Sequence, residues 1–167
     1  TADTRTMAEA TDAGDVATPV TFTCNTMTIL VAKGNPSRIE NLADLARHDV
    51  RFTLCAEPVP CGHLGREVLA HAGVDASPVG SEANVKAVVS KVTSGEVDAG
   101  IVYVTDAEAA AEDASSVAIP ASVNVTTAYP IAVTRDTDAP AVAEAFVAYV
   151  RSAPGRRILA SYGFGAG

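Results

Sequence analysis

The stretch EPVPCGHLGREVL, from Glu57 to Leu69, places a proline and a cysteine at the start of a predicted helix. Three kinds of chemistry suit a cysteine in this position. Cys61 could be a nucleophilic thiolate, it could form half of a disulfide, or it could mark a helix start whose backbone N–H groups bind an anion. The surrounding sequence has to distinguish these interpretations.

A thiol enzyme needs a base beside the cysteine, and His63 and His71 are the candidates. A thiolate at a helix start has a lowered pKa, and a nearby imidazole can accept its proton. His63, however, points roughly 200° away from Cys61 around the helix, and no Asp or Asn is placed to orient it. A metal site made of Cys55, Cys61 and His63 lacks the usual spacing of zinc ligands. We therefore expect no enzyme, no cation site and no cofactor.

The composition describes a folded, acidic protein. Of the 167 residues, 48% are hydrophobic, and the formal net charge is −8. This acidic balance argues against nucleic acid as a partner, because phosphate binding needs clustered Lys and Arg. No run approaches the roughly 20 apolar residues that span a bilayer. The opening TADTRTMAEA resembles the end of a strand entering a helix, without a signal peptide or an initiator Met, so we expect further chain before it in the native protein.

Segments rich in β-branched residues predict the strands. Val20 to Gly34 and Asn124 to Thr134 are long extended segments, Val50 to Cys55 is a buried strand, and Asp98 to Val104 is a central strand.

Apolar residues at helical spacing predict helices between these strands. Strand and helix in alternation build a parallel sheet covered by helices. The first predicted helix runs from Ile39 to Arg47, the second contains Leu64, Val68, Leu69 and Ala72 and ends at Gly73, and the third runs from near Ser81 to Gly95. A fourth begins with Thr105 or Asp106 as its cap, a fifth carries the apolar stripe Val142, Phe146, Tyr149 and Val150, and a last one begins at Pro154.

The two long extended segments enclose a block that looks self-contained, whereas the residues outside them are too few for a core. We interpret these segments as crossovers between two lobes. The expected division is a remnant of the first lobe (1–20), a crossover strand (21–34), an α/β second lobe (35–123), a return crossover strand (124–134) and C-terminal helices of the first lobe (135–167).

The segments NTMTILVAKGNPSRIENLADLA, PVPCGHLGREVLAHAG, ANVKAVVSKVTSGEVDAGIVYVTDA, AYPIAV and GRRILASYGF occur in this order over nearly the whole chain. Together they resemble the periplasmic molybdate-binding proteins of ABC importers. The resemblance implies a type II periplasmic-binding-protein fold, an α/β fold of two lobes with parallel-type sheets joined by two crossover strands. It also implies that the first lobe is incomplete in this sequence and that serine donors to the oxyanion lie upstream.

The resemblance places oxyanion donors at three positions of the second lobe: the backbone N–H of Cys61, the backbone N–H of Val85 and the hydroxyl of Tyr103. Cys61 and Val85 lie in predicted first helical turns, where N–H groups are unpaired and the helix dipole favours an anion. Tyr103 stands near the carboxyl end of a predicted strand, where open α/β sheets bind ligands. Ordinary core packing of the Val85 and Tyr103 side chains is the alternative.

The implied ligand is molybdate or tungstate, delivered to the membrane permease of an ABC importer. The expected form is a periplasmic or extracellular monomer that is lipid-anchored at the cell membrane. In such an oxidising compartment Cys55 and Cys61 are candidates for a disulfide, because a short loop can bring their Cα atoms close. Cys24 is then an unpaired, buried residue of the first crossover strand.

A third class of protein shares this bilobal fold, namely the effector-binding domain of a transcription regulator. It normally follows a helix-turn-helix and a linker helix, and neither is visible in this sequence.

Overall fold

The computed structural model describes Thr1 and residues 3–166. The chain divides into two compact units, one formed by Thr1–Asn25 and Thr126–Gly167 and the other by Thr26–Val125. The long strand β1 (Val20–Ala32) contributes residues to both units. Within the described residues, no helix is long and apolar enough to cross a membrane.

The sheet of the second unit is mixed, with the strand order β3-β2-β4-β1-β5. β2 runs parallel to β3 and to β4, whereas β1 is antiparallel to both β4 and β5. The sheet is therefore mixed and not purely of the predicted parallel type, because β1, predicted as a crossover strand, joins it in the antiparallel direction. The other strands share one direction because helices connect them in sequence, as parallel crossovers require. Their bounds are β2 Phe52–Cys55, β3 Gly80–Glu82, β4 Ala99–Tyr103 and β5 Ala114–Ala118.

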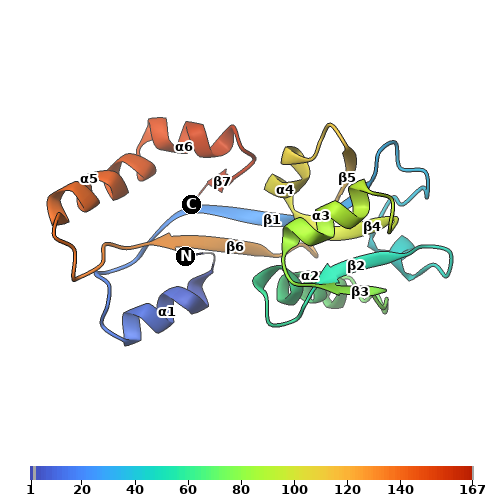
Figure 1. Ribbon diagram of the computed structural model, residues 1–167, viewed down its shortest axis with the longest axis horizontal. Coiled ribbons are helices and arrows are strands. Elements are labelled where there is room, and N and C mark those ends of the chain that lie inside the picture. Colours follow the sequence, from blue (N-terminus) through green and yellow to red (C-terminus); the bar gives the residue numbers. More distant parts are fainter. Residues whose placement is uncertain (2, 167) are drawn as a thin grey trace. The chain divides into compact units, whose positions relative to one another are not determined.

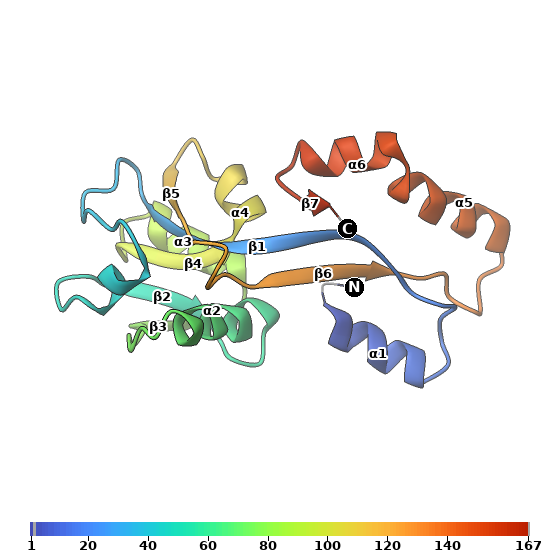
Figure 2. The same cartoon turned by 180° about the vertical axis from the view of Figure 1, so that it is seen from behind.

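Helices α2 (Pro60–His71) and α3 (Val85–Thr93) cover opposite faces of this sheet, as Figure 1 and Figure 2 show. A Cβ added to Gly65 of α2 would meet Leu54 and Ile101, whereas a Cβ added to Gly100 of β4 would meet Val88 of α3. Consecutive strand residues point to opposite faces, so α2 packs on the face of Ile101 and α3 on the face of Gly100. The short helices η1 (Leu42–Ala46) and α4 (Val104–Ala109) complete the unit.

The core of the second unit lies on both faces of the sheet. All four residues of β2 are buried, as are all five of β4, which is expected of strands covered by helices on both sides. The largest fully buried side chains include Phe52, Met27, Ile29, Leu30, Ile39, Leu54 and Ile101.

The first unit contains α1 (Thr4–Asp12), β6 (Thr126–Ile131), α5 (Pro140–Arg151), α6 (Ala153–Ala160) and β7 (Gly165–Ala166). β6 and β7 both pair with β1. Phe22, Tyr129 and Phe164 form an aromatic cluster, with ring centroids 6.5 and 5.8 Å apart. The predicted stripe on α5 is exposed, since Val142, Phe146 and Tyr149 keep 71%, 60% and 52% of their surface.

Several predicted boundaries shift. Ser81 lies in β3, a strand that the sequence did not predict, and α3 begins at Val85 behind an Asn84 cap. Tyr103 itself precedes the first residue of α4, so neither Thr105 nor Asp106 is its cap. The segment predicted as helix from Ile39 to Arg47 contains only the 3₁₀ helix η1, and β5 was also not predicted.

Cys24 is not fully buried as predicted. It is half-buried, and its Sγ donates to the carbonyl of Ala166 in β7 at 2.9 Å.

Candidate functional site

The residues predicted to bind an anion gather at one edge of the sheet in the second unit. Cys55, Glu82 and Tyr103 are the last residues of β2, β3 and β4. Because these strands are parallel, their carboxyl ends share the same edge. The next helix begins within a few residues of each end, so the starts of α2 and α3 lie along this edge.

The connections around β2 make this edge a topological switch point. From β2 the chain passes through α2 to β3 on one side, and from β3 it returns through α3, on the other face, to β4 on the opposite side of β2. Open α/β sheets bind ligands in the crevice that such a reversal leaves between the carboxyl ends of adjacent strands. Here the adjacent strands are β2 and β4.

The start of α2 presents an unpaired backbone donor. Val59 precedes the helix without a side-chain cap, and Pro60 occupies its first turn. The carbonyl of Val59 accepts the N–H groups of Gly62 and His63 at 2.9 and 3.1 Å. Within the described residues, no hydrogen-bond acceptor is found for the N–H of Cys61, which leaves this donor available to an anion.

The start of α3 presents a second such donor. Asn84 is extended (φ −162°, ψ 168°), and its side chain accepts the N–H of Ala87 at 3.0 Å. The Asn84 carbonyl accepts the N–H of Val88 at 3.4 Å. The N–H of Val85 has no acceptor in the part of the chain that the structure describes. The Asn84 side chain thus pairs the N–H of the third helical residue, Ala87, and leaves the N–H of the first, Val85, without an acceptor among the described residues.

Tyr103 ends β4 beside these helix starts. It is buried, with 9% of its surface exposed, and it lies opposite Met27 of β1 in the antiparallel register. Its position at the carboxyl end of a central strand agrees with the position expected from the sequence.

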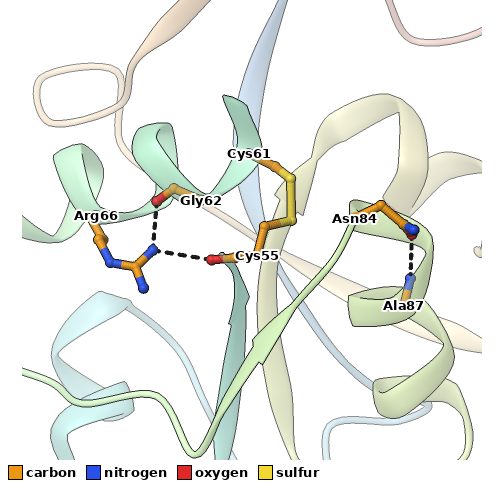
Figure 3. Close-up of a disulfide and its surroundings, with 6 residues drawn as sticks. All are labelled: Cys55, Cys61, Gly62, Arg66, Asn84 and Ala87. Atoms are coloured by element: carbon orange, nitrogen blue, oxygen red, sulfur yellow. Dashed lines mark hydrogen bonds between the residues drawn. A yellow bond between two sulfur atoms is a disulfide. The ribbon is translucent and has the colours of Figure 1, made fainter. Parts of the chain in front are cut away.

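The cysteines at this edge form the predicted disulfide. Cys55 and Cys61 are bonded, with their Cα atoms 5.7 Å apart, and Figure 3 shows the bond joining the end of β2 to the start of α2. The disulfide consumes both sulfurs. In this oxidised form of the protein, Cys61 can therefore be neither a nucleophilic thiolate nor a zinc ligand.

His63 and His71 are not directed at a cysteine. Both lie on the exposed side of α2 beside Glu67, with Nε2 to carboxylate distances of 3.9 and 3.8 Å. Among the described residues, no group of three or more His, Cys, Asp or Glu side chains is placed to hold a metal ion.

Two acidic side chains near this edge, Glu82 and Asp106, each have a lysine as a neighbour. Glu82 is 9% exposed, accepts the hydroxyl of Thr53 at 2.8 Å and contacts Lys91 Nζ at 3.1 Å. The hydrogen bond to Glu82, supported by one to Glu96, raises the pKa of Lys91. Burial raises the pKa of Asp106 in α4, and the charge of Lys86 in α3 opposes that rise.

Removal of the disulfide should lower stability measurably. For a loop as short as the one between Cys55 and Cys61, chain entropy predicts a loss of about 2 kcal/mol in the free energy of unfolding. Denaturant titration of the C55S/C61S double variant, compared with the oxidised parent, measures this loss. A Cys24→Ser variant is the control and should unfold like the parent, because Cys24 forms no disulfide and a serine hydroxyl can also donate to the carbonyl of Ala166.

The chain shares its fold with periplasmic-type binding proteins. The periplasmic molybdate-binding protein of Azotobacter vinelandii has the same fold, with a TM-score of 0.79 and 21% identity, covering 100% of this chain and 75% of that one.

The chain belongs to the family of bacterial extracellular solute-binding proteins, whose sequence profile matches residues 1–165. The molybdate-binding protein ModA of Mycobacterium tuberculosis is 42% identical over 164 residues, which are 98% of this chain and 63% of the relative. A Bacillus subtilis protein named as an ABC transporter substrate-binding lipoprotein, YvgL, is 28% identical over 145 residues, 84% of this chain and 55% of that protein. The chain thus spans less than two thirds of these relatives. The predicted resemblance is confirmed, and the family is one of solute-binding proteins and not of enzymes.

Proposed function

We propose that this chain is the part of an extracellular solute-binding protein that captures the oxyanion molybdate or tungstate. The N–H of Cys61, the N–H of Val85 and the hydroxyl of Tyr103 are its donors. The observation that carries the proposal is the pair of unpaired amides at the starts of α2 and α3, on one sheet edge at a switch point. The identity of 42% to a molybdate-binding protein supports this choice of ligand.

Neutral donors suit a dianion that must be released again. A lysine or arginine clamp would bind phosphate and other anions as well, whereas amides and a phenol bring no formal charge. Selection then depends on cavity size and on the absence of inward acceptors. Protonated phosphate needs an acceptor for its hydrogen, molybdate and tungstate do not, and the smaller sulfate leaves some donors too far away. The pairing of Glu82 with Thr53 and Lys91 agrees with a site whose acceptors are already engaged.

We further propose that the full-length protein acts as a monomer on the outer side of the cytoplasmic membrane, held there by a lipid anchor. It would deliver the anion to the membrane permease of an ABC importer. The extracellular family and the name of the Bacillus subtilis relative support this location. We also propose a division into two lobes joined by crossover strands. The first lobe would comprise residues 1–20 and 135–167, the second lobe residues 35–123, and the crossovers residues 21–34 and 124–134. Further donors to the anion would come from the first lobe.

Calorimetry on the full-length native protein with molybdate, tungstate, sulfate and phosphate tests the proposal. Molybdate and tungstate should bind with one-to-one stoichiometry, and at neutral pH sulfate and phosphate should bind much more weakly. Phosphate binding as tight as molybdate binding would show that the site contains an acceptor, and would contradict the proposal.

Replacing Tyr103 with phenylalanine should weaken molybdate binding about tenfold, because one hydrogen bond to a charged group is lost. The ring remains to fill the same space, so circular dichroism should show that the fold is retained. Tyr149→Phe removes a hydroxyl from the exposed face of α5 and is the matched control. Equal affinities of the two variants would remove Tyr103 from the set of donors.

A further inference from the structure

Arg66 lies in the second turn of α2 and points its guanidinium back toward the start of the helix. Its Nη1 donates to the carbonyl of Gly62 at 2.9 Å and to the carbonyl of Cys55 at 3.1 Å. One nitrogen thereby joins the last residue of β2 to the first turn of α2 (Figure 3). The side chain is half-buried, unlike a typical surface arginine.

The same short turn is held on its other side by the disulfide. In Figure 3 the Cys55 carbonyl points to Arg66, while the bond between Cys55 and Cys61 rises on the opposite side of the turn. The N–H of Ala56 donates to the carbonyl of Glu82 at 2.7 Å, which ties the turn to the end of β3 and hence to the segment that begins α3. The two helix starts are therefore linked through a few short contacts.

We infer that Arg66 is a positioning residue of the oxyanion site, acting through the turn between β2 and α2. This inference rests on the proposed function. By joining the carbonyls of Cys55 and Gly62, Arg66 holds together the two ends of the turn that contains the Pro60–Cys61 peptide, and so limits how far the Cys61 N–H can change direction. The disulfide fixes the Cys61 side chain, but a single covalent link at Sγ leaves the backbone dihedrals of the turn free to adjust.

Arg66 also engages an acceptor that would otherwise disfavour an anion. The carbonyl of Cys55 stands at the carboxyl end of β2, where the strand ladder with β4 has already stopped after Thr53. A carbonyl oxygen directed at an oxyanion repels it. A site that selects molybdate over other oxyanions by the spacing of its donors therefore needs walls without free acceptors. The guanidinium binds this carbonyl on the side of the turn away from the disulfide.

The test compares Arg66→Met, Arg66→Lys and Arg51→Met in the full-length native protein. Methionine keeps much of the apolar stem and removes the donors, whereas lysine keeps a donor with a shorter reach. Arg51 is the charge-matched control: it lies at the opposite end of β2, and its hydrogen bonds to Asp98 use its backbone. Calorimetry with molybdate and with sulfate gives both affinities and their ratio, and a thermal melt reports stability.

Arg66→Met should weaken molybdate binding about tenfold or more, as the loss of a group that orients a ligand-binding atom typically does. It should also reduce the preference for molybdate over sulfate, because that preference depends on donor spacing. Arg66→Lys should lie between parent and Arg66→Met, and Arg51→Met should match the parent. In a titration followed by amide NMR, the shift of the Cys61 N–H on adding molybdate should shrink in Arg66→Met, while that of Val85 persists.

Two results would overturn the inference alone, with the parent still binding molybdate. One is an Arg66→Met variant with the affinity and selectivity of the parent. The other is an equal loss of molybdate and sulfate affinity together with a large fall in melting temperature, which would make Arg66 a structural residue only. A parent that binds no molybdate would overturn both the inference and the proposed function.

Discussion

Replacing Val85 with proline is expected to weaken molybdate binding about 10- to 100-fold while the fold stays intact, because one amide hydrogen bond to a charged ligand disappears. Val85 is the first residue of α3, so its N–H takes no part in the hydrogen bonds of the helix. Proline is well tolerated at this position. The preceding Asn84 is already extended, as a residue before proline must be.

Val85→Ala is the matched control for this substitution. It shortens the side chain but keeps the N–H, so molybdate affinity should stay close to that of the parent. Calorimetry measures both variants, and circular dichroism confirms that α3 is retained. If Val85→Pro binds as tightly as Val85→Ala, the Val85 amide is not a donor and the site has to be sought elsewhere on the sheet.

The alternation of strand and helix could be predicted from the sequence because each element carries its own signal. The β-branched run from Val20 predicted β1, and Gly73, which has φ +64°, marked the end of α2. β3 was missed because Gly80, Ser81 and Glu82 have no strand propensity. Their pairing with Thr53, Leu54 and Cys55 makes them a strand, and that pairing is a tertiary contact.

The direction of β1 could not be predicted for a related reason. Its sequence is that of a buried strand, and burial on both faces is usual for parallel strands. The chain returns from Ala32 to Phe52 without a crossover helix, and this connection makes β1 antiparallel to its neighbour β4. This connection contains only the short η1, which the sequence had suggested as an ordinary helix.

The positions of the candidate donors were predictable, whereas the groups that support them were not. Pro60 indicates where α2 begins, whereas the valine periodicity placed the start of α3 near Ser81, and the resemblance to molybdate-binding proteins pointed to Val85. Asn84 carried a recognisable signal, an asparagine directly before an apolar helical pattern, and it was overlooked in favour of Ser81. Arg66 carried none, because an arginine on a helix most often faces solvent, and its link to Cys55 depends on the approach of β2.

Gly62→Ala should be the most disruptive single substitution at this site. An alanine Cβ at this position would lie 2.0 Å from the Ala56 carbonyl oxygen and 2.6 Å from that of Cys55. Both atoms belong to the backbone of the turn, so no side-chain rotation relieves the contact. We expect the free energy of unfolding to fall by about 3 kcal/mol, at the upper end of the usual cost of overpacking.

Gly65→Ala is the control within the same helix. There the new Cβ would approach Leu54 Cδ2 at 3.2 Å, the end of a side chain that can move, and the higher helix propensity of alanine offsets part of the cost. Denaturant titration should therefore separate the two variants clearly. Because the turn at Gly62 also carries the Cys61 N–H, Gly62→Ala should lose molybdate affinity as well, whereas Gly65→Ala should retain it. Equal stability of the two variants would mean that the turn between β2 and α2 yields easily, and a turn of that kind could not hold a donor in a fixed direction.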